Sequence, residues 1–496
     1  MTTLAPLAPP TASAPRTKGT SGLVTVSSTL FGLVFALSFY IYRKVTLAIF
    51  AAAAGVFKAL RLAPVIRRAP TTFALLSVAG AIAAAPFGDL VFALQRPSRA
   101  ALLGLAAYWL SSGVFMLASE VLCTPPGELT RLREVLDRRF PERWFLRWLD
   151  HPVDAYFVRV TIHSTILVVP ALLAFALRPS PSPLTALFCL LGQRVIARVH
   201  EAMDHGNIHN QVFRPRADAP PVAAAICRAV GFYQEYPLNL AVGRIPGMYP
   251  IQHVAVHHAE DGSLDDNQTT VLRDRTSFLQ YCATCTTWLL SRLFALDVAY
   301  YLLVRRRTKL LRSLLLHVAG YYLFLGLVAL VSPHAVLLIF ISHALPTPDT
   351  VITQYNWHGF VDIADFHNTY RNTIHVASTV ELGFLGLNAH LHHHLHASCH
   401  WSEIANEARR EEDRYRREGA AILRGSNRDR MLLVKLLFAR DFKALAGEFA
   451  SIGDAPREDF ARILEERTLP LVPRRWPAAL VSFDRALGRA FARVLL

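Results

Sequence analysis

Runs of apolar residues long enough to cross a lipid bilayer recur along this chain. A membrane-spanning helix needs roughly 20 such residues. Runs of about this length occupy residues 23–42, 45–62, 71–94, 101–122, 157–177 and 184–199. The last two are separated by Arg-Pro-Ser-Pro-Ser-Pro, which predicts a tight break between antiparallel helices. The pattern predicts an all-α integral membrane protein, a helical bundle that crosses the membrane several times.

Two more apolar stretches, 278–304 and 310–345, are joined by the basic sequence Arg-Arg-Arg-Thr-Lys. The second stretch is long enough for a hairpin, with Ser332-Pro333 as its turn. If 278–304 and 310–331 each crossed the membrane once, the basic turn would face the outside, which the positive-inside rule disfavours. We therefore expect 278–304 to lie along the membrane interface, and 310–331 and 334–345 to form the hairpin.

The remaining segments are more polar and divide the chain. Residues 1–22 are rich in Ala, Pro, Thr and Ser, which predicts disorder. This stretch delays the first apolar run too long for a typical signal peptide, so residues 23–122 are interpreted as retained N-terminal transmembrane helices. Residues 123–156 are predicted to form an amphipathic cytoplasmic or interfacial connector. Residues 402–496 begin with dense charge and continue with amphipathic helical patterns, which predicts a cytoplasmic helical tail.

Composition agrees with a membrane location. The 496 residues are 53% hydrophobic and 18% charged, with a formal net charge of +15 and a mean hydropathy of +0.30. A basic surplus in so apolar a chain suits a membrane protein with a basic cytoplasmic face. The sequence has no basic-aromatic nucleic-acid module, so no nucleic-acid partner is expected. Cys282 and Cys285 form a CxxC inside an apolar run, where they are interpreted as small apolar fillers.

Candidate chemistry comes from the histidines, of which the chain has 20. Eleven fall into three short clusters beside apolar segments. The clusters contain His200, His205 and His209; His253, His257 and His258; and His390, His392, His393, His394 and His396. Neutral imidazole is the commonest side-chain ligand for a transition metal. The histidines at ligand spacing exceed what one four-coordinate zinc site needs, and they match a two-metal site.

Helical phase selects the ligands within each cluster. His205 and His209 are four residues apart and would share a helix face, whereas His200 lies on another face unless the helix ends or distorts there. In the second cluster His253 and His257 share a face, and His258 turns toward a neighbouring position. The third cluster has His390 and His394 four apart, with His393 at i+3. His392 and His396 fall outside this spacing and could be supporting or solvent-facing residues, or part of a loose metal-scavenging loop.

The three clusters together resemble the histidine boxes of the membrane fatty-acid desaturase superfamily, which includes desaturases, hydroxylases and carotenoid ketolases. His200–His205 resembles the HxxxxH box, His253–His258 the HxxxHH box and His390–His394 the HxxHH box. Gly386-Leu-Asn388 before the third box and His400-Trp401 after it also fit the family pattern. The resemblance covers about residues 157–401, interpreted as a desaturase-like domain with a cytoplasmic di-iron cap.

This resemblance implies two iron ions, O₂ as co-substrate and a further ligand between the second and third boxes. The ligands that it implies within the boxes are His200, His205, His253, His257, His258, His390, His393 and His394. His367 is the first choice for that ligand, with His358 and His375 as alternatives. His209 departs from the family box and is either an extra ligand or a supporting residue. Carboxylates that could accept a distal imidazole N–H, or that could be plain surface charges, are Glu201, Asp204, Glu260, Asp261 and Glu381.

The expected function is O₂-dependent desaturation of a lipid acyl chain at the membrane. Hydroxylation or ketolation of a fatty-acyl or carotenoid substrate is the alternative on the same scaffold. A metal transporter with a His-rich loop is a distant alternative, because the apolar segments hold few ionisable residues. The sequence has no haem-binding or iron–sulfur segment, so we expect a separate electron donor, such as a ferredoxin or a reductase, on the basic face.

Overall fold

The structure, a computed structural model, describes residues 142–176, 200–344, 346–365, 368–377, 386–424, 430–472 and 476–494. The apolar segments predicted at 23–42, 45–62, 71–94, 101–122 and 184–199 lie outside these residues, as does the stretch 1–22 that is predicted to be disordered.

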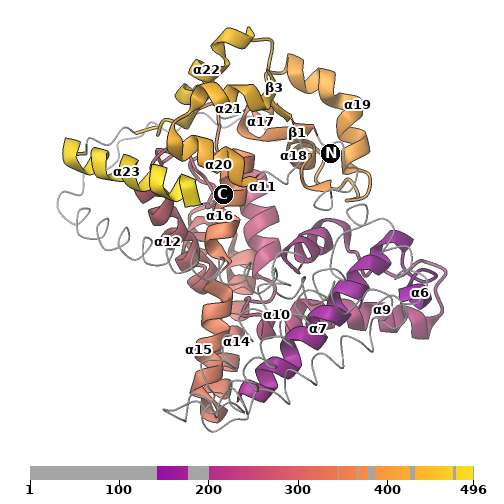
Figure 1. Ribbon diagram of the computed structural model, residues 1–496. Helices are drawn as coiled ribbons and strands as arrows, with labels where there is room; N and C mark the ends of the chain where they lie inside the picture. The colour runs from indigo at the N-terminus through magenta and orange to yellow at the C-terminus, as the bar shows by residue number, and fades with distance from the viewer. Residues whose placement is uncertain are drawn as a thin grey trace, which may run out of the picture.

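Three long apolar helices extend toward one end of the molecule, and a small sheet with most of the C-terminal helices lies at the other (Figure 1). The three are α7 (Ala155–Ala176), α14 (Thr308–Val331) and α15 (Pro333–Ala344). α7 coincides closely with the apolar run predicted at 157–177. The predicted hairpin turn is also present, because Ser332 alone separates α14 from α15.

Several shorter helices accompany these elements. They are α6 (Glu142–Phe145), α9 (Pro221–Tyr233), α10 (Asn239–Ala241), α11 (His258–Glu260), α16 (Thr347–His358), α17 (Thr369–Asn372) and α18 (His390–Leu395). Two π-helices, Gln234–Leu238 and Pro250–His257, lie directly before α10 and α11.

Candidate membrane spans are found among the described helices. Thr308–Val331 and Pro333–His358, which contains α15 and α16, are long and apolar enough to cross a bilayer. On α14, Leu316, Leu323 and Leu330 recur every seven residues and are 74%, 66% and 84% exposed. Such a regular stripe of exposed leucines is what a lipid-facing helix surface requires.

The segment predicted to lie along the interface is bent rather than straight. α12 (Phe278–Phe294) and α13 (Leu296–Val304) meet at 76°. The bend is at Ala295, whose φ of 52° places it in the left-handed region. Most of α12 is buried against other helices. Its relation to the membrane surface stays a prediction.

A three-stranded sheet corrects the all-α prediction. β1 (Ile374–Ala377) pairs in parallel with β2 (Ala421–Arg424), which pairs antiparallel with β3 (Phe449–Ile452). The described residues are otherwise mostly helical, as predicted. The strands were missed because each has four residues, too few for a period-two pattern to stand out between helices.

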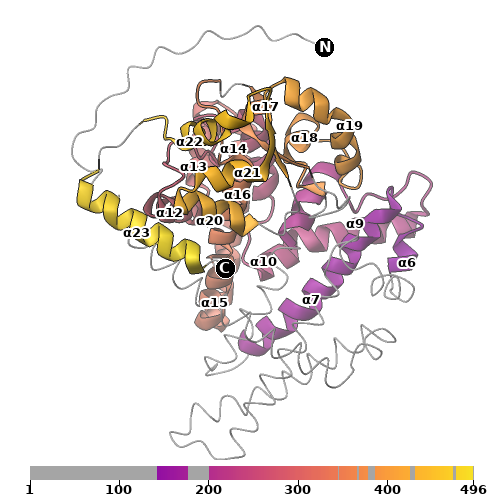
Figure 2. The same cartoon turned by 45° about the horizontal axis from the view of Figure 1, so that its top comes forward.

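The C-terminal helices share a core with the rest of the molecule. They are α19 (Ile404–Arg417), α20 (Arg430–Ala439), α21 (Phe442–Glu448), α22 (Phe460–Thr468) and α23 (Ala478–Val494). Phe438 of α20 and Phe491 of α23 pack on Phe278 and Tyr281 of α12. Figure 2 shows α12, α20 and α23 gathered at the same side. Residues before and after Ser402 therefore pack into one core.

Candidate metal centre

The first histidine cluster lies on a continuous helical stretch, residues 200–210. His205 and His209 share a face, as their spacing predicts, and their ring centroids are 4.7 Å apart. Because the helix is not interrupted, His200 points elsewhere. Its Nε2 is 2.8 Å from Oδ1 of Asn239 on α10. The structure thus brings together the second and third histidines of this cluster and leaves the first outside.

The second cluster lies on the π-helix Pro250–His257 and the start of α11. In a π-helix residues five apart are neighbours, because the backbone hydrogen bonds run from i to i+5. His253 and His258 therefore meet, with their Nε2 atoms 3.1 Å apart. His257 turns to a different point. The sequence predicts His253 and His257 as the pair on one face, and this pairing differs because the local period is longer than 3.6 residues.

The third cluster lies on α18, which is helical as predicted. His390 and His394 are one turn apart with Nε2 atoms at 3.2 Å. His358, the last residue of α16, joins them, with its Nε2 3.0 Å from Nε2 of His390. His393 points away from these three, toward His205 and His209.

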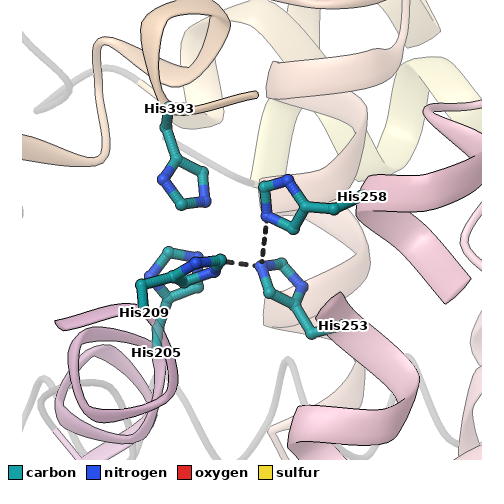
Figure 3. Close-up of side chains that lie close together, drawn as sticks. All are labelled: His205, His209, His253, His258 and His393. Atoms are coloured by element: carbon teal, nitrogen blue, oxygen red, sulfur yellow. Dashed lines mark hydrogen bonds between the residues drawn. The ribbon is translucent and has the colours of Figure 1, made fainter. Parts of the chain in front are cut away.

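Nine histidines form two groups in which the possible ligand atoms lie within 4.8 Å of one another. The first group is His205, His209, His253, His258 and His393; the second is His257, His358, His390 and His394. Figure 3 shows the rings of the first group converging from three separate segments. Of the sequence candidates, His200 and His375 are in neither group, and His367 and Glu381 lie outside the described residues.

The spacing of the nitrogen atoms suits metal ligation. Nε2 of His253 is 3.0 Å from that of His205 and 3.1 Å from that of His258. One ring nitrogen carries at most one proton and cannot hydrogen-bond well to both. Around a metal with bonds of about 2.1 Å at right angles, neighbouring nitrogens are about 3.0 Å apart. Nε2 of His209 and Nε2 of His393 are buried without a hydrogen-bond partner. Buried polar atoms normally have a partner, and a metal ion would provide one for both.

Burial keeps most of the rings neutral. It lowers the pKa of His205, His253 and His393 well below the usual value, and the neighbouring imidazoles lower it further. Burial also lowers the pKa of His209 to about 4. Neutral imidazole is the form that binds metal ions. The two groups therefore offer a donor set that fits two transition-metal ions.

In the second group, hydrogen-bond acceptors hold two of the nitrogens that face away from the centre, and a carboxylate lies beside a third. Nδ1 of His257 is 2.8 Å from Oδ2 of Asp266, and Nδ1 of His358 is 3.0 Å from the carbonyl oxygen of Asn372. Oδ1 of Asp261 lies 2.9 Å from Nδ1 of His394. Acceptors at Nδ1 place the lone pair on Nε2, which faces the group. Burial lowers the pKa of His257, but the carboxylates of Asp266 and Asp261 together more than offset this, so the pKa is raised.

Of the candidate carboxylates, Asp261 is beside a grouped histidine, and three others make ion pairs elsewhere. Glu201 lies 3.9 Å from Arg244 and 3.7 Å from Arg292, and Asp204 is 2.5 Å from Arg244. Glu260 lies 3.2 Å from Arg305 and also accepts a hydrogen bond from the hydroxyl of Tyr301. Asp266 was missed, because it follows His257 by nine residues across a loop and no helical spacing links the two.

A cavity of about 90 Å³ opens beside both groups. His205 and His253 of the first group and His257 and His390 of the second line one part of it. Its apolar lining includes Ala202, Trp288, Trp357 and Leu387, and its polar lining includes Glu201, Arg244, Arg292, Thr350 and Gln354. A substrate in this cavity would therefore lie against the imidazoles of both groups.

Comparison with known proteins identifies the family. Residues 181–425 match the model of a family described as fatty acid desaturase. The chain belongs to the membrane fatty-acid desaturase/hydroxylase superfamily. All nine grouped histidines of this desaturase-family chain lie inside the matched residues. Searches of curated proteins and of solved structures found no match.

Proposed function

We propose that this chain is a membrane-bound di-iron oxidoreductase that desaturates a lipid acyl chain, using O₂ and electrons from a separate donor protein. The observation that carries the proposal is the pair of histidine groups, one with five histidines and one with four. Zinc sites have about four ligands in all, so nine imidazoles suit two redox-active ions better than one zinc. Two irons, when bound, would supply the activation of O₂ that oxidises an unactivated C–H bond.

The grouped histidines are the proposed ligands, and the residues around them have distinct roles. Asp261, Asp266 and the Asn372 carbonyl would fix the orientation of three imidazoles. Trp357 packs flat on His390, with ring centroids 4.0 Å apart, and would hold that ring in place. His200, which is bonded to Asn239, would support the packing of the first cluster instead of binding a metal.

The cavity supports an extended lipid substrate close to both groups. Trp288, Trp357 and Leu387 would contact an acyl segment and exclude water from it. Desaturation then removes two hydrogen atoms from adjacent carbons while O₂ is reduced to water with two electrons from the donor. The basic surplus of the chain supports an acidic donor protein, such as a ferredoxin or the docking domain of a reductase.

Hydroxylation or ketolation is a second candidate, favoured by the polar side of the cavity. Arg244, Arg292 and Thr350 could hydrogen-bond to an oxygen atom next to the oxidised carbon. We place desaturation first, because the family model that matches is that of fatty acid desaturases. Product mass separates the two: desaturation removes two hydrogens, and hydroxylation adds one oxygen.

The test is iron content and lipid oxidation in cells that express the chain. We expect about two irons per wild-type chain. His257→Ala and His393→Ala, one from each group, should lower iron content and abolish oxidation, since a lost ligand upsets both affinity and geometry. His334→Ala is the matched control, because His334 is exposed on α15 and far from both groups in sequence. Stoichiometric zinc with no dependence of activity on iron would contradict the proposal.

A further inference from the structure

A third group of possible metal ligands joins α18 to α19, apart from the two histidine groups. Ligand atoms of His392, His396 and Glu411 lie within 4.8 Å of one another. His392 is buried, at 2% exposed. The side chains of His396 and Glu411 are 44% and 28% exposed. The group therefore has one buried ligand, and two partly exposed ligands whose side chains can rotate toward an ion.

The ring of His392 is already oriented for ligation. Its Nδ1 is 2.6 Å from the hydroxyl of Tyr415, which is itself fully buried on α19. With the proton on Nδ1, which then donates to the phenol oxygen, the lone pair lies on Nε2, and Nε2 is the nitrogen left for a metal. The ring of His396 is beside that of His392, with centroids 4.6 Å apart. A hydrogen bond to the far nitrogen is the usual companion of a metal-bound histidine.

The separation of His396 and Glu411 also points to an ion. Nε2 of His396 is 3.5 Å from Oε1 of Glu411. This exceeds the range of about 2.7–3.2 Å for a good N–H···O hydrogen bond. Two ligands of a tetrahedral ion with bonds of about 2.1 Å are about 3.4 Å apart. Other ligand atoms of the group are up to 4.8 Å apart. Rotation of the partly exposed side chains of His396 and Glu411 can shorten these distances.

We propose that His392, His396 and Glu411 form a third metal site that takes Zn²⁺, with water as the fourth ligand. Two imidazoles, one carboxylate and an open position are a common zinc donor set. The ion would tie α19 to α18, the helix that carries His390, His393 and His394. The site does not depend on the proposed oxidation chemistry, because its own readout is bound zinc.

The test uses full-length, iron-loaded protein titrated with Zn²⁺ and dialysed, with iron and zinc measured in the same sample. We expect one zinc per chain and unchanged iron in the wild type. His396→Ala and Glu411→Gln should weaken zinc binding by more than about tenfold and keep their iron. Tyr415→Phe should weaken it about tenfold, because the ring of His392 loses its anchor. Co²⁺ in place of zinc should give the visible band of a tetrahedral site in wild type but not in the two ligand variants.

Glu412→Gln is the matched control, since Glu412 is next to Glu411 but about 100° around the helix. It should bind zinc as the wild type does. The proposal is overturned if the wild type binds no zinc beyond its iron, or if zinc enters only as iron leaves. It is equally overturned if His396→Ala and Glu411→Gln bind zinc as tightly as Glu412→Gln. Protein without iron would count against the proposed function and leave the zinc result readable.

Discussion

The surroundings of each ring, not its burial, distinguish a ligand from a packed histidine in this chain. His358 and His375 are almost equally buried, at 1% and 2% exposed. The Nε2 atom of His358 faces other imidazole nitrogens, while its Nδ1 is held by a backbone carbonyl. His375 lies in β1 with its ring 5.3 Å from that of Tyr415, and it belongs to neither histidine group. The first arrangement fits ligation, and the second fits a packed core residue.

We therefore expect His358→Ala to lower iron content as severely as a mutation within the boxes. His375→Ala removes an equally buried imidazole and should retain iron, although its stability should fall because a cavity is left. Metal analysis of the two purified variants decides the matter. Equal iron loss in both would mean that packing, not ligation, accounts for the effect of His358.

Part of this site was predictable at the residue level and part was not. The i, i+4 pairs His205/His209 and His390/His394 follow from helical phase alone, and each pair stays in one group. His253/His257 does not, because a π-helix leaves no separate mark in the pattern of apolar residues. His358 was one of three open choices, since a ligand contributed from a distant helix has no local spacing. Asp266 had no signal of this kind at all.

At the scale of elements, the position of α18 depends on the turn before it. Gly386 has φ +76°, a conformation that disfavours side chains. A Cβ added there would lie 2.5 Å from the carbonyl oxygen of Trp401. The indole N–H of Trp401 is bonded to Asp154 at 2.6 Å, so the residue it meets is itself held in place. The turn and the tryptophan together fix where the third cluster begins.

Gly386→Ala should destabilise the protein by more than about 1 kcal/mol, through backbone strain and the clash with Trp401. It should also lower iron content, because α18 carries ligands of both groups. Gly326→Ala on α14 is the control, since nothing lies within 4 Å of its added Cβ. Alanine there should be neutral or stabilising. Apparent Tm and bound iron are the measurements, and an unchanged Gly386→Ala protein would contradict this account of the turn.

At the scale of the whole molecule, contacts relate the basic turn to the second cluster. Arg305 is 3.2 Å from Glu260 and 2.7 Å from Asp265, and Arg307 donates to the carbonyl of Ala255. Groups in direct contact lie on the same side of any bilayer. This supports the proposal that the second cluster and the basic turn share one face, which the positive-inside rule predicts to be the cytoplasmic one.

Cysteine labelling tests that topology. With a membrane-impermeant maleimide, Arg306→Cys and Leu264→Cys should both be protected in intact cells and both react after permeabilisation. Both positions are exposed, so failure to react would not come from burial. Opposite accessibility would show that Phe278–Val304 crosses the membrane and would overturn the interfacial placement of this segment.

Two pairs of adjacent histidines are divided between the two groups: His258 and His393 belong to the first, and His257 and His394 to the second. An ion bound in one group therefore fixes the backbone that presents ligands to the other, so the second ion meets ligands already in place. Loading should be cooperative. Native mass spectrometry at less than two irons per chain should find mainly metal-free and two-iron protein. A one-iron population at the level expected for independent sites would show that iron binding to one group does not change the affinity of the other.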